Sequence, residues 1–134
     1  MLKMDISDQD WYKEALSKWL KEYGEVPPPW VYRPNSHPYS IEWRMGAGES
    51  FLMVFWQWWE DKSFSEAEAL AFFKKHTPPP RWLGWVCETI WDLDGQKALD
   101  NDYEKEFIVL EANGFEGTKD YIRDLEDTKW LDSY

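Results

Sequence analysis

The chain has little of what would name an activity: one cysteine, two histidines and no long apolar run in 134 residues. The lone Cys87 excludes an internal disulfide and favours a reducing compartment. The longest apolar run, Phe51 to Trp56, has six residues, far fewer than the roughly 20 that span a bilayer. The first eight residues contain no apolar core of the kind that a secretory signal needs. We therefore expect a cytoplasmic protein without a membrane span.

Positive charge is also scarce, because 15 Lys and Arg residues face 26 Asp and Glu residues, for a net charge of −11. Residues 91–134 alone hold 13 acidic and 5 basic residues, a net of −8, against −3 for residues 1–90. Such an excess of carboxylates opposes contact with phosphate backbones and with anionic membrane surfaces. We expect no direct binding of nucleic acid or membranes, and a protein partner that carries a basic surface.

Tryptophan is abundant, with 11 residues, and the apolar share of the chain is 43%. A chain of this length is able to bury a core without disulfides or metals. We expect one globular domain over residues 1–134. The indoles indicate either an unusually aromatic core or an aromatic surface reserved for a partner.

Apolar residues at helical spacing predict an all-α fold, a compact bundle of five to six helices. Gly24 is placed to end the first helix, and Ser65 with Glu68 matches a capping box that opens the third. Gly84 lies inside the fourth helix, where glycine is unfavourable, and therefore indicates close packing. The expected helical ranges are about 8–23, 50–61, 66–76, 81–93, 103–112 and 119–127.

Residues 40–58 admit two structures. Ile41, Trp43 and Met45 alternate with polar residues, which is a strand pattern. The segment Gly46–Gly48 is typical of a turn, and Ser50 after it is placed to cap a helix. We favour that helix, and a small β-hairpin over 40–58, with Phe51–Trp58 as its second strand, is the alternative.

Residues 25–40 contain five prolines and predict a long irregular loop rich in aromatic residues. Its aromatic side chains would be costly to leave in water, so we expect them to point inward. Polar groups on a loop held by a rigid scaffold often form binding sites, and a recognition surface here competes with a loop that only seals the core. The residues of this candidate recognition loop are Trp30, Tyr32, Arg33, His37, Tyr39, Trp43 and Arg44.

The sequence contains no motif that predicts a catalytic residue, a metal or a cofactor. The acidic segment from Asp92 lacks the ligand spacing of a calcium loop, because Gly95 falls at the wrong position. The glycines at 46 and 48 lack the lysine of a phosphate-binding loop. Neither histidine has a second ligand at metal spacing, and Cys87 is flanked by no helper base.

Small size, high negative charge and the lack of a catalytic motif resemble, in composition, toxin-neutralising immunity proteins and phage anti-defence inhibitors. We therefore expect a non-enzymatic acidic protein that binds and inhibits or regulates a basic protein partner. A mimic of nucleic acid, with carboxylates in place of phosphates, is one form of this hypothesis. The expected binding face is the acidic C-terminal third, especially Asp120, Asp124, Glu126, Asp127 and Asp132.

Two other functions remain open from the sequence. An aromatic-lined module for a peptide or small ligand would use Trp30, Tyr32 and Trp43. A small hydrolase or transferase would use His37 with Glu42 or Glu49, provided that the base and the group that orients it lie within hydrogen-bond reach.

Overall fold

The computed structural model describes residues 5–93 and 95–133, and this part of the chain contains eight α-helices, four 3-10 helices and no strand. The prediction of an all-α fold is confirmed. The elements in chain order are α1 (Asp10–Tyr23), α2 (Pro29–Tyr32), η1 (Ile41–Trp43), α3 (Gly46–Lys62), α4 (Glu66–Lys75), η2 (Pro80–Trp82), α5 (Leu83–Trp91), α6 (Gly95–Asp100), α7 (Glu104–Ala112), η3 (Thr118–Asp120), α8 (Tyr121–Leu125) and η4 (Thr128–Ser133).

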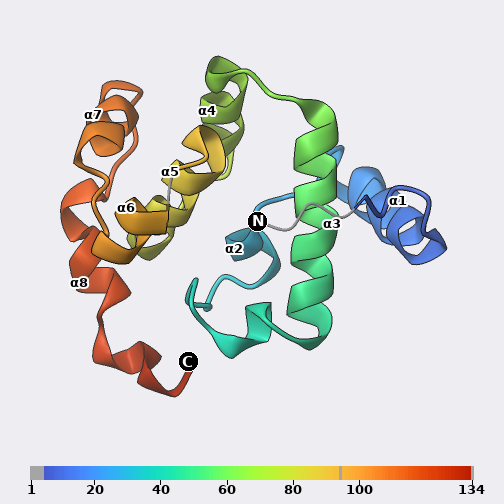
Figure 1. The fold of residues 1–134 in the computed structure, drawn as a ribbon, viewed down its shortest axis with the longest axis horizontal. Coiled ribbons are helices and arrows are strands. Elements are labelled where there is room, and N and C mark those ends of the chain that lie inside the picture. Colours follow the sequence, from blue (N-terminus) through green and yellow to red (C-terminus); the bar gives the residue numbers. More distant parts are fainter. Residues whose placement is uncertain (1–4, 94, 134) are drawn as a thin grey trace.

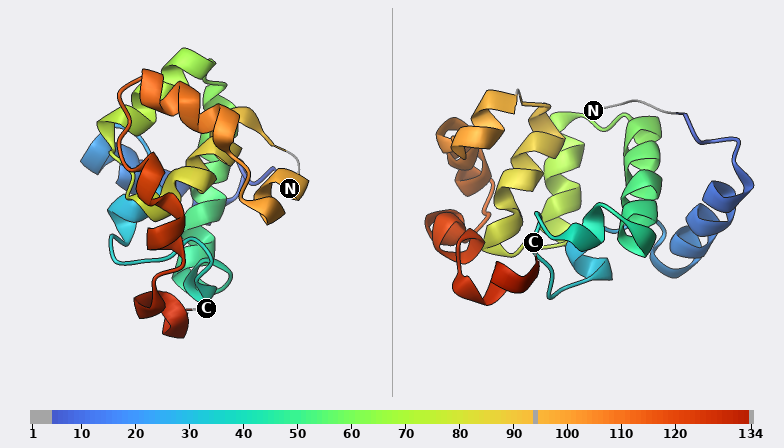
Figure 2. Two further views of the ribbon diagram at one scale, coloured as in Figure 1. Left: turned by 90° about the vertical axis from the view of Figure 1, so that its left-hand side faces the viewer. Right: turned by 60° about the horizontal axis from the view of Figure 1, so that its bottom comes forward.

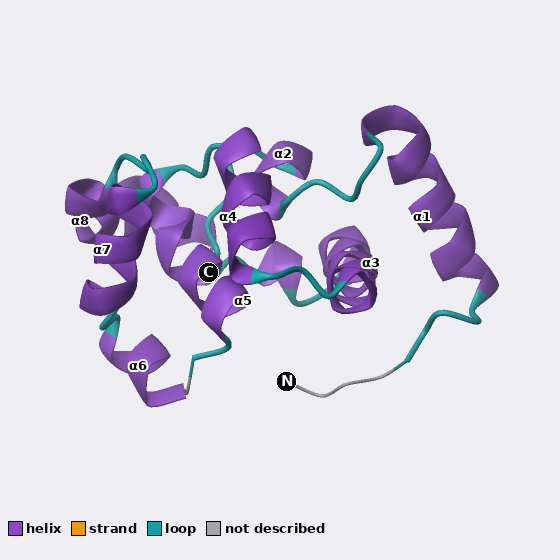
Figure 3. Ribbon diagram, turned by 90° about the horizontal axis from the view of Figure 1, so that it is seen from above, coloured by secondary structure: helices purple, strands orange, loops and turns teal. Residues whose placement is uncertain are grey.

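The helices follow one another across the molecule. Figure 1 shows α1 at one side with α3 next to it, α4 and α5 in the middle, and α6, α7 and α8 at the opposite side. The view from above in Figure 3 gives the same order. The C-terminal third is therefore separated from α1 by the central helices.

Local sequence signals set several helix ends as predicted. Gly24 adopts φ 75° after α1, and its N–H donates to the Leu20 carbonyl at 2.8 Å. Ser65 and Glu68 form the reciprocal capping box that opens α4, with bonds of 3.2 and 3.0 Å. The first helix begins later than expected, at Asp10.

The hairpin alternative for residues 40–58 is absent, and the assignment of Gly46–Gly48 to a turn is wrong. These glycines form the first turn of α3, with Met45 as its N-cap. A Cβ atom on Gly48 would lie 1.8 Å from the Glu42 carbonyl oxygen. Glycine is thus required here because η1 packs directly against the start of α3.

The helix count of five to six is exceeded by two short helices in segments expected to be irregular. Pro29 occupies the first position of α2, where its missing N–H costs no hydrogen bond. In the other segment, α5 ends at Trp91 and α6 then covers Gly95–Asp100.

Buried apolar side chains form one cluster with α3 near its centre. Phe55 of α3 is fully buried, stacks on Trp59 at 5.7 Å and lies 5.5 Å from Trp85. Trp82 lies 5.7 Å from both Trp30 and Trp43, which joins the proline-rich loop to the segment that starts α5. Offset and edge-to-face ring pairs of this kind each contribute about 0.5–1.5 kcal/mol beyond the area they bury.

The close packing predicted at Gly84 is confirmed. A Cβ atom there would lie 2.3 Å from the Tyr121 hydroxyl oxygen and 2.8 Å from a ring carbon of Tyr103. Gly84 therefore lets α5 approach the C-terminal third, because both tyrosines come from that part of the chain.

We predict that Gly48→Ala lowers the free energy of unfolding by about 2–3 kcal/mol, because the added methyl must displace a backbone carbonyl. The neighbouring Glu49→Ala is the control, since this exposed side chain should change stability by no more than about 0.5 kcal/mol. Urea unfolding of both variants measures the difference. Equal stability of Gly48→Ala and the wild type would contradict the packing of η1 on α3.

Candidate functional site

Three of the seven candidate recognition residues, in the proline-rich loop and in η1 directly after it, are buried. Trp30 and Trp43 are each 5% exposed, and His37 is fully buried. The Trp30 indole N–H donates to the His76 carbonyl at 2.9 Å, which fixes the loop to the end of α4. Trp30 and Trp43 therefore belong to the hydrophobic core, His37 is a buried polar residue, and none of the three offers a surface to a partner.

The other four candidate residues lie at or near the surface. Tyr32 stacks on Phe51 at 4.7 Å. Arg33 lies 5.0 Å from the Tyr32 ring centre and forms an ion pair of 3.2 Å with Glu42. Tyr39 and Arg44 are exposed. The loop thus presents scattered surface residues rather than one continuous aromatic patch.

His37 is a structural link between the loop and α8. Its Nε2 donates to the Leu125 carbonyl at 2.7 Å, and its Nδ1 accepts the Tyr39 N–H at 3.0 Å. Burial lowers the pKa of the ring below its ordinary value, and the positive charge of Arg81 acts in the same direction. With both nitrogens bonded to backbone groups, His37 does not point a free nitrogen at a substrate.

Arg81 forms the most connected polar junction of the described structure, and no pattern in the sequence singles it out. Its Nε donates to the Ser36 carbonyl at 2.7 Å and its Nη2 to the Pro34 carbonyl at 2.8 Å. Its backbone N–H and Nη1 donate to one oxygen of Asp124, at 3.0 and 3.3 Å. The guanidinium also lies 4.3 Å from the Trp130 ring centre.

The five carboxylates of the expected binding face occupy different environments. Asp124 is 17% exposed and paired with Arg81, so it stabilises the fold. Asp120 pairs with Arg123, and Asp127 accepts the Lys129 N–H at 3.0 Å. Glu126 is exposed. The side chain of Asp132 lies outside the described part of the structure.

Other exposed carboxylates of the C-terminal third were not singled out from the sequence. Asp92, Asp102, Glu104 and Glu116 are exposed, and their side-chain carboxylates form no hydrogen bond or ion pair with the described residues. Glu106, by contrast, is neutralised by Lys97 at 3.1 Å. The unpaired carboxylates differ from Glu106 in having no cationic partner among the described residues, and the order of residues in the sequence does not reveal which carboxylates are paired.

The side chains of residues 5–93 and 95–133 do not assemble three or more His, Cys, Asp or Glu groups at a metal-binding distance. Cys87 is buried, and burial raises the pKa of its thiol. Among the described helices, none has the length and apolar character to cross a membrane. No protein-family model, curated protein or solved structure matches the chain.

We predict that Asp124→Asn lowers the free energy of unfolding by about 3 kcal/mol, because it leaves the Arg81 guanidinium unpaired in a buried site. Glu126→Gln, two residues away and exposed, should change it by less than about 0.5 kcal/mol. Chemical denaturation of the two variants provides the comparison. Similar effects of the two substitutions would show that Asp124 is not part of a buried junction.

The lowered pKa of His37 predicts a loss of stability in acid. The unfolded chain takes up a proton near the ordinary value of 6.5, whereas the folded chain does so only at lower pH. The contribution of His37 is therefore complete above about pH 6.5 and is lost as the pH falls through its folded pKa. An NMR titration of the His37 ring should give a midpoint below 6.5, and a midpoint at or above that value would exclude the buried, neutral ring.

Proposed function

We propose that this is a small acidic cytoplasmic protein that binds, and thereby inhibits or regulates, a protein partner with a basic surface. The binding surface in this proposal is the acidic face, which we define as Asp92, Asp102, Glu104, Glu116 and Glu126. One observation supports it above the others: these five exposed carboxylates have no hydrogen-bonding or ionic partner among the described residues.

The acidic face belongs to the side of the molecule formed by residues 91–134. The left view of Figure 2 looks onto this side, with α6, α7 and α8 toward the viewer. The net charge is −8 for residues 91–134 and −3 for residues 1–90, so most of the negative charge belongs to the side of the molecule that residues 91–134 form. A surface of one sign accelerates encounter with a surface of the opposite sign and disfavours other partners.

The carboxylates are attached to a well-packed layer. Tyr121 and Leu125 of α8 are each 3% exposed, and Leu110 of α7 is fully buried. Arg81 and His37 bond this layer to the proline-rich loop. A surface that is ordered before binding loses less conformational entropy when the complex forms.

Two charge variants of equal size test the proposal. The first, Glu104→Gln/Glu116→Gln/Glu126→Gln, removes three charges from the acidic face. The second removes three exposed charges at the α1 end of the molecule through Asp8→Asn/Asp10→Asn/Glu14→Gln. Each variant includes a carboxylate from the first turn of a helix, Glu104 of α7 in one and Asp10 of α1 in the other, so changes in helix stability are similar.

Both variants and the wild type are used to capture partners from the source cell, and the affinity of the recovered partner is then measured at about 0.05 M and about 0.3 M salt. We expect a basic partner whose binding weakens about tenfold or more in the acidic-face variant, because three ionic contacts at about 0.5 kcal/mol each are lost. The α1 variant should bind within about twofold of the wild type, and salt should weaken binding in the wild type most.

Equal binding by both variants would overturn the proposal, as would an affinity that does not depend on salt. A nucleic-acid mimic makes one further prediction. If the carboxylates mimic phosphates, double-stranded DNA should compete with the protein for the recovered partner.

A further inference from the structure

A groove lies between α1 and α3. Figure 1 shows α1 on the side of the molecule away from α6, α7 and α8. The groove has a volume of about 380 Å³, within the range of small-molecule sites. The residues that matter for its chemistry are Trp11, Lys18 and Trp19 of α1, Tyr32 of α2, and Ser50 and Phe51 of α3.

The groove lies where α1, which is anchored at both ends, packs only partly against α3. Before α1, Ile6 is buried and its N–H donates to the Gln57 side chain at 2.9 Å. After α1, Val26 is fully buried. Within α1 itself, all of which is described, only Tyr12 is buried.

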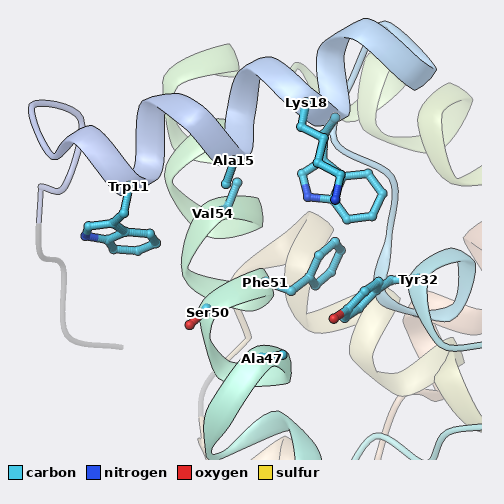
Figure 4. Close-up of a pocket in the computed structure, with 9 residues that line it drawn as sticks. Trp11, Ala15, Lys18, Tyr32, Ala47, Ser50, Phe51 and Val54 are labelled. Carbon is cyan, nitrogen blue, oxygen red and sulfur yellow. The ribbon is translucent and has the colours of Figure 1, made fainter.

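The two ends of the groove differ. Figure 4 shows Trp11 at one end and Tyr32 and Phe51 at the other, with Ala15 and Val54 between them. Trp19 lies 5.5 Å from Phe51 and 5.7 Å from Tyr32, so one end is a packed group of three rings. Trp11 is 40% exposed and contacts no other aromatic ring of the described structure, which leaves its indole available for stacking.

Lys18 adds a positive charge to this apolar site. Trp11, Ala15 and Lys18 are spaced at i, i+4 and i+7, so they lie on one face of α1. Lys18 is exposed and forms no ion pair with any described residue. The seven-residue separation places the Trp11 and Lys18 backbones about 10 Å apart along the helix axis.

We propose that this groove binds a small amphipathic anion: a molecule about 10 Å long with an aromatic or alkyl body and one carboxylate or sulfonate end. The apolar body would lie against Trp11 and the small side chains of Ala15 and Val54. The anionic end would pair with Lys18. This inference is independent of the proposed function, because the two sites share no residue.

Phenylbutyrate and phenylbutanol are a matched pair of probes, since they share a ring and a chain and differ in the charged end. We expect phenylbutyrate to bind the wild type at least fivefold more tightly than phenylbutanol, because the former pairs its charge with Lys18. In NMR spectra of the indole N–H groups, the Trp11 and Trp19 signals should shift during the titration, while those of Trp30, Trp43 and Trp82 should not. The Trp11→Ala variant identifies the Trp11 signal.

Lys18→Gln should reduce the affinity for phenylbutyrate about fivefold or more and leave that for phenylbutanol unchanged. Lys13→Gln is the control, because it removes the same charge from the opposite face of α1, and it should alter neither affinity. Trp11→Ala should weaken both ligands. The proposal is overturned by a lack of saturable binding, by equal effects of the two lysine variants, or by shifts confined to buried indoles.

Discussion

The fold depends on one buried cation. Arg81 follows three consecutive prolines and contacts three other parts of the chain: two carbonyls of the proline-rich loop, the carboxylate of Asp124 in α8, and the ring of Trp130 in η4. A buried guanidinium is tolerated only where its charge is paired and its N–H groups are bonded. The irregular loop supplies the carbonyls and α8 supplies the charge, so each of these segments is fixed by the other.

This junction gives the two sides of the molecule different properties. On the C-terminal side, Arg81 and His37 attach α8 to a loop whose Trp30 lies in the core, so the charged surface rests on a packed layer. On the other side, α1 has no comparable polar junction among the described residues and buries only Tyr12. The C-terminal side is tightly packed, whereas the looser packing of α1 leaves a groove with the exposed Trp11 at one end.

Local signals in the sequence predicted much of the fold, whereas long-range contacts decided the rest. Gly24, the Ser65–Glu68 capping box and the close approach at Gly84 were predicted because each depends on neighbours or on helix propensity. The assignment of residues 46–48 to a turn is wrong because Gly48 is required by its contact with the Glu42 carbonyl, while Gly46, with φ 64°, is the first residue of α3. At the candidate sites, sequence pattern separated neither buried Trp30 from exposed Trp11 nor paired Asp124 from free Glu126, since pairing and burial arise only in the folded chain.

The central claim is that α7 and α8, on the side of the molecule that carries the acidic face, unfold only together with the aromatic core. Native-state hydrogen exchange measures this directly, because it gives a free energy of opening for each protected amide. The account predicts that amides of α7 and α8 open with the same free energy as those of α3 around Phe55, through global unfolding. Exchange of α7 and α8 at a clearly lower free energy, with α3 still protected, would show that these two helices detach on their own and would contradict the account.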